Sequence, residues 1–154
     1  MLDGAARIEK LAEEVAKSGD GAIAMTDHGN VFGAFDFYKT MMKSGVKPII
    51  GIEAYVAPES RFDKKRVKWA DGGEDDVSSG GAYTHMTILA ENDQGLKNLF
   101  ALSSLASLEG YYYKPRIDRE LISRYASGLI ATTGCPGGEV QTRLRMGAYE
   151  EARR

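Results

Sequence analysis

Five side chains of metal-binding type stand at spaced positions along this chain of 154 residues. They are Asp3, His28, Glu53, His85 and Cys135, which include both histidines and the only cysteine. Their separations are 25, 25, 32 and 50 residues, and a strand–helix unit takes roughly 30 residues, so each belongs to a different unit. Carboxylate, imidazole and thiolate groups bind zinc, and oxygen donors also admit manganese or magnesium. The pattern predicts a centre for divalent metal ions, with zinc as the first choice.

Four of these residues also have a purely structural interpretation. Asp3 stands where it could cap the helix that follows it, and His28 lies in a Thr-Asp-His-Gly sequence typical of a turn. His85 could be a hydrogen-bonded core histidine, and Cys135 a small buried apolar residue. Glu53 fits such an interpretation least, because burying a carboxylate among isoleucines is costly unless it is paired or bound to a metal. The coincidence of all five favours the metal centre.

A metal centre of this kind requires a fold that brings distant strand ends together. Hydrophobic periodicity predicts strands over 22–25, 47–56, 83–90 and 128–132, and helices over 4–18, 31–44, 92–108 and 118–124, with two more from about 138 and 148. Strands that alternate with helices favour parallel pairing and an α/β fold, a barrel or alternatively an open doubly wound sheet. In a barrel, functional groups gather at the carboxyl ends of the strands. The segment 58–82 breaks the periodicity and is expected to be a surface insertion.

Composition narrows the class of protein. The net charge of −2 and the 43% hydrophobic content are typical of one globular domain. A single cysteine excludes internal disulfides and favours a cytoplasmic location. The sequence has no long apolar run and no secretory signal, so we expect no membrane association. Because the chain opens on a helix without a preceding strand and stops within another, we expect it to be a segment of a larger protein.

Three motifs carry a resemblance to a known family. The sequences TDHGN, KPIIGIEAY and TTGCPGGEV make the chain similar to the PHP (polymerase and histidinol phosphatase) domain of bacterial DNA polymerase III alpha subunits over nearly its whole length. The resemblance implies that residues 1–154 are the central part of one PHP domain, truncated at both ends. It also implies a distorted β/α barrel with a cluster of up to three metal ions. The family's ligand positions match Asp3, His28, Glu53, His85 and Cys135.

The resemblance further implies a function for the intact protein. It would be a replicative DNA-directed DNA polymerase, a nucleotidyltransferase whose partners are primer–template DNA, deoxynucleoside triphosphates and other replisome subunits such as the sliding clamp. Its PHP domain would act as a metal-dependent 3′–5′ proofreading exonuclease, although the segment alone would be inactive. Two alternatives stay open: a metal-stabilised structural domain without catalysis, and a small-molecule phosphoesterase of the histidinol phosphatase type.

One carboxylate beside the predicted ligands has two interpretations. Asp27 precedes His28 directly, so it could orient that imidazole by a hydrogen bond, as carboxylates near metal ligands often do. Alternatively it forms an Asx-turn.

Two segments have the composition of DNA contacts. Lys114 and Arg116 stand beside three tyrosines, a mixture of stacking faces and positive charge found in single-strand binders. Lys64, Lys65 and Arg66 form a basic run that could contact phosphates. The alternatives are that the tyrosines pack within the domain, and that the basic run, balanced by nearby acids, is a solvated part of the insertion.

Overall fold

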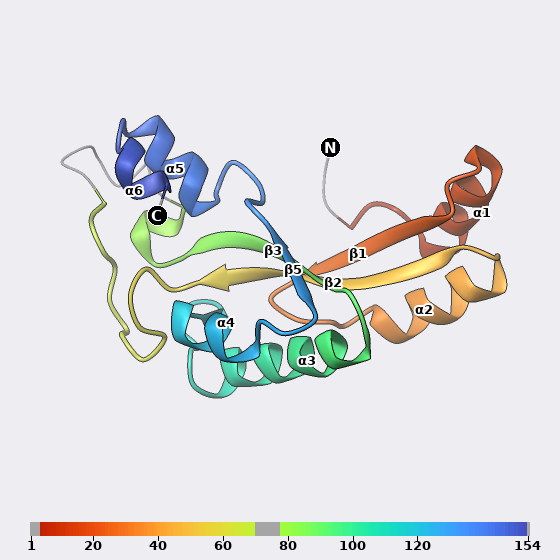
Figure 1. Cartoon of the computed structure of the whole chain (residues 1–154), viewed down its shortest axis with the longest axis horizontal. Coiled ribbons are helices and arrows are strands. Elements are labelled where there is room, and N and C mark those ends of the chain that lie inside the picture. The colour runs from red at the N-terminus through yellow and green to blue at the C-terminus, as the bar shows by residue number, and fades with distance from the viewer. Residues whose placement is uncertain (1–3, 70–77, 154) are drawn as a thin grey trace.

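The structure, a computed structural model, describes residues 4–69 and 78–153. It contains one five-stranded sheet with helices along it (Figure 1). The strands are β1 (Ala22–His28), β2 (Lys47–Val56), β3 (Thr84–Ala90), β4 (Arg116–Ile117) and β5 (Leu129–Thr132). The helices are α1 (Ile8–Ser18), α2 (Ala34–Lys43), α3 (Asp93–Leu108), α4 (Arg119–Tyr125), α5 (Glu139–Arg145) and α6 (Tyr149–Arg153), with a 3-10 turn, η2 (Ser78–Gly81). In the described part of the chain, no helix combines the length and apolar character needed to cross a bilayer.

The sheet is mixed, with the strand order β1-β2-β3-β5. Strand β1 runs parallel to β2, whereas β3 runs antiparallel to both β2 and β5. The α/β class is confirmed, but the expectation of parallel pairing throughout was wrong. The physical reason lies in the connection between β2 and β3, whose described part carries no α-helical crossover to return the chain to the other end of the sheet.

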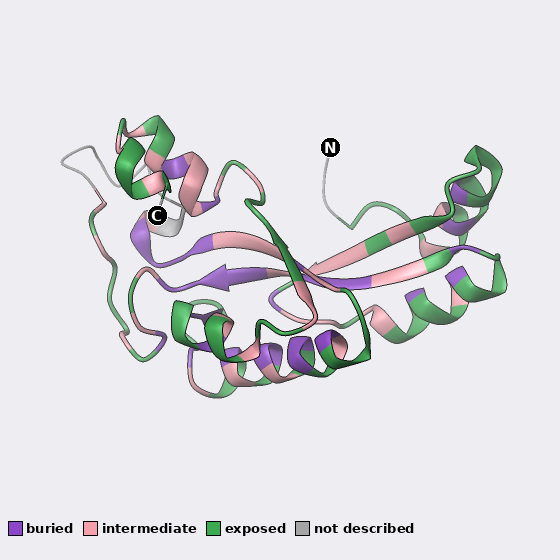
Figure 2. Ribbon diagram, viewed as in Figure 1, coloured by how far each residue is buried: buried purple, intermediate pink, exposed green. Residues whose placement is uncertain are grey.

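Side chains along β2 point alternately to two faces of the sheet, one buried in the core and one turned away from it. Ile50, Ile52, Ala54 and Val56 are buried in the core together with side chains of α2 and α3. These helices and α4 lie along one side of the strands (Figure 1), and buried ribbon is seen on β2, β3 and α3 (Figure 2). Glu53, one residue out of phase, therefore lies on the face turned away from α2 and α3.

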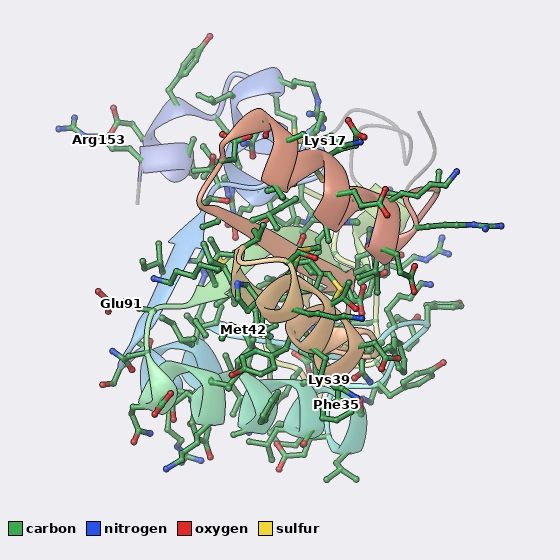
Figure 3. The ribbon with its side chains drawn as sticks, turned by 90° about the vertical axis from the view of Figure 1, so that its right-hand side faces the viewer. Lys17, Phe35, Lys39, Met42, Glu91 and Arg153 are labelled. Carbon is green, nitrogen blue, oxygen red and sulfur yellow. The ribbon has the colours of Figure 1, made fainter. Side chains whose placement is uncertain are left out.

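Helix α2 shows how the helical side of the sheet is closed. Phe37 and Met41, four residues apart, are buried against the core. Phe35 and Lys39 lie on the outer side of the helix (Figure 3), with the Lys39 ammonium 5.1 Å from the centre of the Phe35 ring. The amphipathic pattern of the sequence thus fixes which face of α2 meets the sheet.

The segment 58–82 is tied to the domain more firmly than a surface insertion requires. Its described part has no α-helix or strand, but Arg61 is only 7% exposed. The Arg61 guanidinium binds the carboxylates of Asp118, Glu109 and Glu120 at 2.6 to 3.1 Å. The expectation therefore needs a correction at the start of the segment, because a buried guanidinium bound by three carboxylates fixes this part of the chain to the domain.

Arg116 holds the same segment from the other side. Its guanidinium has no exposed surface and donates hydrogen bonds to the backbone carbonyls of Arg61, Asp63, Ala82 and Gly110. Burial lowers the pKa of Arg116, with Tyr112 and Asp63 acting in the opposite direction. Arg116 is thus a structural anchor that ties both ends of the insertion to β4.

The contacts of Asp118 with Arg61 make the attachment of the segment 58–82 depend on pH. Burial by itself raises the pKa of Asp118, but hydrogen bonds from the Arg61 and Leu121 amides and the Arg61 guanidinium outweigh burial and hold the pKa below its ordinary value. A carboxyl whose pKa is lowered in the folded state stabilises the fold above the unfolded-state pKa, and this contribution is lost as the pH falls through the folded-state pKa.

We therefore expect Asp118→Asn to loosen residues 58–69 at neutral pH, with the difference from wild type shrinking below about pH 4. Hydrogen exchange of wild type and variant, compared at each pH, measures this difference. A difference that stays constant from neutral pH to pH 3 would show that the Asp118 charge is not its source.

Candidate metal centre

Three of the five predicted ligands converge on the sheet face turned away from α2 and α3. His28 is the last residue of β1 and pairs in register with Glu53 of the parallel strand β2. His85 pairs with Tyr55, two residues beyond Glu53, so its side chain lies on the same face. Each residue offers one ligand atom, and the three atoms lie within 4.8 Å of one another.

The two imidazoles approach different oxygens of one carboxylate. His85 Nδ1 lies 2.5 Å from Glu53 Oε1, and His28 Nδ1 lies 3.6 Å from Glu53 Oε2. The side chains of Glu53 and His85 are 18% and 19% exposed, and that of His28 is 41% exposed. The cluster is thus half-buried, with His28 on the side that solvent reaches.

The antiparallel direction of β3 is what brings His85 to this centre. His85 is the second residue of β3, so in a parallel strand it would lie at the far end of the sheet from Glu53. Because β3 starts where β2 ends, the beginning of β3 meets the carboxyl ends of β1 and β2. The structure therefore brings His85 to His28 and Glu53, as the sequence predicted, but through a strand of the opposite direction.

Cys135 lies at the edge of the cluster, in the loop after β5. Its Sγ is 3.9 Å from Glu53 Oε1, and the Gly137 amide donates to that sulfur at 3.4 Å. The loop is held against β3, because the His85 amide donates to the carbonyl of Gly137. The thiol is therefore near the same carboxylate oxygen as His85, without belonging to the compact group of three.

Two further carboxylates are candidates for the site, Asp3 as a ligand and Asp27 as a neighbour that orients His28. Asp3 lies outside the described residues. The helix predicted over 4–18 begins only at Ile8, with Arg7 at its N-cap position. Asp27 precedes His28 in β1 and so points to the opposite face. Its Oδ2 accepts a hydrogen bond from the Gly33 amide at 2.8 Å. This contact favours a loop-stabilising role over one in orienting His28.

A wall of aromatic rings borders the cluster, and no motif of the sequence marks these rings as part of the site. The Tyr55 ring lies 5.3 Å from the His85 ring and 6.3 Å from the His28 ring, between centres, and Tyr83 packs edge-on against it at 4.8 Å. Burial raises the pKa of Tyr55, and Tyr83 and Glu53 add to the increase, so the phenol stays neutral. Tyr55 follows Glu53 by two residues, a spacing that already predicted a shared face.

A cavity of about 540 Å³ leads from the cluster to the edge of β1. Its lining includes Thr26, His28 and Glu53, together with Gly4 and Ala6 from the segment before α1. Thus the half-buried cluster opens into a space wider than a single ion needs.

The five basic residues predicted to contact DNA do not behave alike. Arg116 is fully buried and cannot reach a phosphate, which corrects that prediction. Lys64 donates to the carbonyl of Glu109, and Lys65 pairs with Glu59 at 3.2 Å. The remaining two pack on tyrosine rings: Lys114 over Tyr55 and Arg66 over Tyr113.

The donor set fits a divalent metal ion. Two imidazoles and one carboxylate, with a thiol next to them, are the ligands that zinc uses in proteins, and the carboxylate also suits manganese. The half-buried Glu53 carboxylate turns one oxygen toward each ring. This face of the sheet therefore offers three ligand atoms that a divalent metal ion could use.

Comparison with known proteins identifies the family. The PHP domain matches residues 1–154. DNA polymerase III subunit alpha of Mycobacterium leprae (strain TN) is 61% identical over 155 residues, covering 99% of this chain and 13% of that protein. The same subunit of Saccharopolyspora erythraea is 58% identical over 161 residues, which cover 99% of this chain and 14% of that protein. The subunit of Thermus aquaticus is 54% identical over 142 residues, which cover 91% of this chain and 11% of that protein. The chain spans 11 to 14% of the length of these relatives, and it belongs to the PHP domain family.

Proposed function

We propose that the chain is part of the alpha subunit of a replicative DNA polymerase. The support is the identity of 54 to 61% to three proteins of that name over nearly the whole chain. The intact protein would then extend primer–template DNA from deoxynucleoside triphosphates in the cytoplasm, together with other replisome subunits such as the sliding clamp. The region 1–154 would be the central part of its PHP domain and would be inactive alone.

The proposed role of this region is to bind divalent metal ions and to hydrolyse the 3′-terminal phosphodiester of a DNA strand. The observation that carries the proposal is the convergence of His28, Glu53 and His85 within 4.8 Å on one open sheet face. Asp3 and Cys135 would complete the ligand set. Zinc is the metal we favour, with manganese or magnesium as alternatives.

Each described side chain has a distinct part in this proposal. A bound divalent ion supplies positive charge that polarises a phosphoryl group and makes water more acidic. Glu53 presents one oxygen to each imidazole and so fixes both rings. His28, the most exposed of the three, lies on the side from which a DNA end would enter. Tyr55 and Tyr83 keep water from the inner side of the cluster.

A metal-stabilised structural domain is the alternative with support in the geometry, because the cluster joins β1, β2, β3 and the loop after β5. Under that alternative, metal removal would loosen the domain but no nuclease activity would exist.

Chelation of the intact protein separates these possibilities. We expect EDTA to abolish release of the 3′-terminal nucleotide from a mismatched primer, and zinc or manganese to restore it. His28→Ala should prevent the restoration, whereas Lys17→Ala, an exposed charge change on α1, should not. Purified protein that binds the metal but removes no nucleotide would support the structural alternative.

A further inference from the structure

The tyrosine-rich turn before β4 meets the metal centre because of where β4 joins the sheet. Strand β3 occupies one side of β2 along residues 51–56, so β4, which pairs with Tyr55 and Val56, lies on the side of β1. Strand β1 ends at His28, opposite Glu53. The residues that lead into β4 therefore face the residues that follow β1.

The contact between these two loops is close. Gly29 adopts a positive φ of 68°, and a Cβ at this position would lie 2.8 Å from the Tyr55 ring and 2.9 Å from Pro115. The backbone after His28 is thus wedged between the aromatic wall of the centre and the turn. This packing fixes the position of the turn relative to His28.

The turn is closed by one backbone hydrogen bond, and its tyrosines Tyr112 and Tyr113 point to different surroundings. The Tyr112 amide donates to the Lys114 carbonyl, and Tyr113 between them adopts the left-handed conformation at φ 61°. Tyr112 packs inward against Tyr55 and its neighbours. Tyr113 stays 60% exposed, with the Arg66 guanidinium 5.6 Å from its ring centre.

Lys114 is the cation that this turn places on the ring of Tyr55. Its ammonium lies 5.7 Å from the centre of the Tyr55 ring, the same ring that flanks both histidines. Among the described residues it has no carboxylate partner, unlike Lys65, which pairs with Glu59 and Asp63. A lysine held on an aromatic face without an anion keeps its charge available for a ligand.

We propose that Lys114 and Tyr113 form a binding subsite for the terminal nucleotide of a single DNA strand, next to the metal centre. Lys114 binds a phosphate near the 3′ end of the strand, and the exposed ring of Tyr113 stacks on a base, with Arg66 supporting the ring. Stacking on an aromatic face combined with a phosphate-binding cation is how single strands are bound without sequence preference. The role given to this subsite rests on the proposed nuclease function.

Photo-crosslinking tests the subsite without requiring hydrolysis. The probe is a short oligothymidylate with 4-thiothymidine at its 3′ end and a phosphorothioate as its last linkage, bound to the intact protein. We expect the crosslink to map to residues 111–115. Lys114→Ala should reduce its yield about tenfold, the loss expected for one charge-assisted contact. Tyr113→Asn, which suits the left-handed conformation but removes the ring, should also reduce it.

Two controls and one kinetic measurement complete the test. Lys17→Ala and Tyr149→Ala remove an exposed lysine and an exposed tyrosine elsewhere, and both should leave the yield unchanged. With an unmodified strand, Lys114→Ala should raise KM about tenfold while kcat and metal content stay within about twofold. Crosslinks at 111–115 without hydrolysis would contradict the nuclease but keep the subsite. Crosslinks elsewhere, or equal yields in wild type and Lys114→Ala, would overturn the subsite.

Discussion

Glu53→Ala should lower the metal affinity of the intact protein and its 3′–5′ exonuclease activity at least about 100-fold. Loss of a group that only hydrogen-bonds a metal ligand already lowers metal affinity or activity about 10- to 100-fold, and loss of a ligand should cost more. Glu53 is the residue that both imidazoles approach, at 2.5 Å and 3.6 Å. Its removal therefore takes away one ligand and the group that holds two others. The measurement is metal titration of the chelated protein, followed by release of the 3′ nucleotide at saturating metal.

Glu53→Gln makes this prediction sharper, because it keeps the size of the side chain but removes the charge. We expect it to be nearly as damaging as Glu53→Ala if the carboxylate binds a cation. Glu59→Gln, an exposed glutamate paired only with Lys65 among the described residues, serves as the matched control. Unchanged metal affinity in Glu53→Gln would contradict a ligand role for Glu53.

Arg116→Met should loosen the insertion and the turn without a direct effect on metal ligands. The variant removes this donor from four backbone carbonyls, of which that of Arg61 keeps a second donor, the Lys64 ammonium at 3.4 Å. Among the described residues, each of the three others is left unsatisfied by the change, and an unsatisfied buried group costs about 1–3 kcal/mol. We expect a local loss of about 3 kcal/mol, which is roughly a hundredfold faster amide exchange. Hydrogen exchange of residues 58–69 and 110–117 in the intact protein measures it.

The control for this variant is Arg124→Met. Arg124 is an exposed arginine whose side chain is 62% exposed and pairs with Glu120, so its loss should change exchange little. Equal exchange in Arg116→Met and Arg124→Met would contradict the anchoring role. A large loss of DNA binding by Arg116→Met with unchanged exchange would instead indicate that Arg116 contacts a phosphate.

The sequence predicted the elements of the fold better than their directions. The strand 47–56 and the helix after Asn92 appear with nearly the expected bounds, because apolar periodicity and a capping residue are local signals. The direction of β3 is not a local property. It depends on the path of the connection after β2, whose sequence has no apolar period that would reveal it.

The same distinction holds for the candidate site. His28, Glu53 and His85 could be found because scarce polar groups in apolar strands are conspicuous. The inward role of Arg116 could not be found, since its four partners are backbone carbonyls from three separate segments. The local sequence, an arginine close to tyrosines, is the same whether the arginine side chain faces solvent or the interior.

Anomalous diffraction from crystals of the intact protein grown with zinc, or with manganese, tests the metal centre most directly. We predict an anomalous peak within about 2.0–2.3 Å of the nearest atoms of His28, Glu53 and His85, and its loss in Glu53→Ala crystals grown under the same conditions. No peak between these three side chains at saturating metal, with peaks only at other sites, would contradict the central claim.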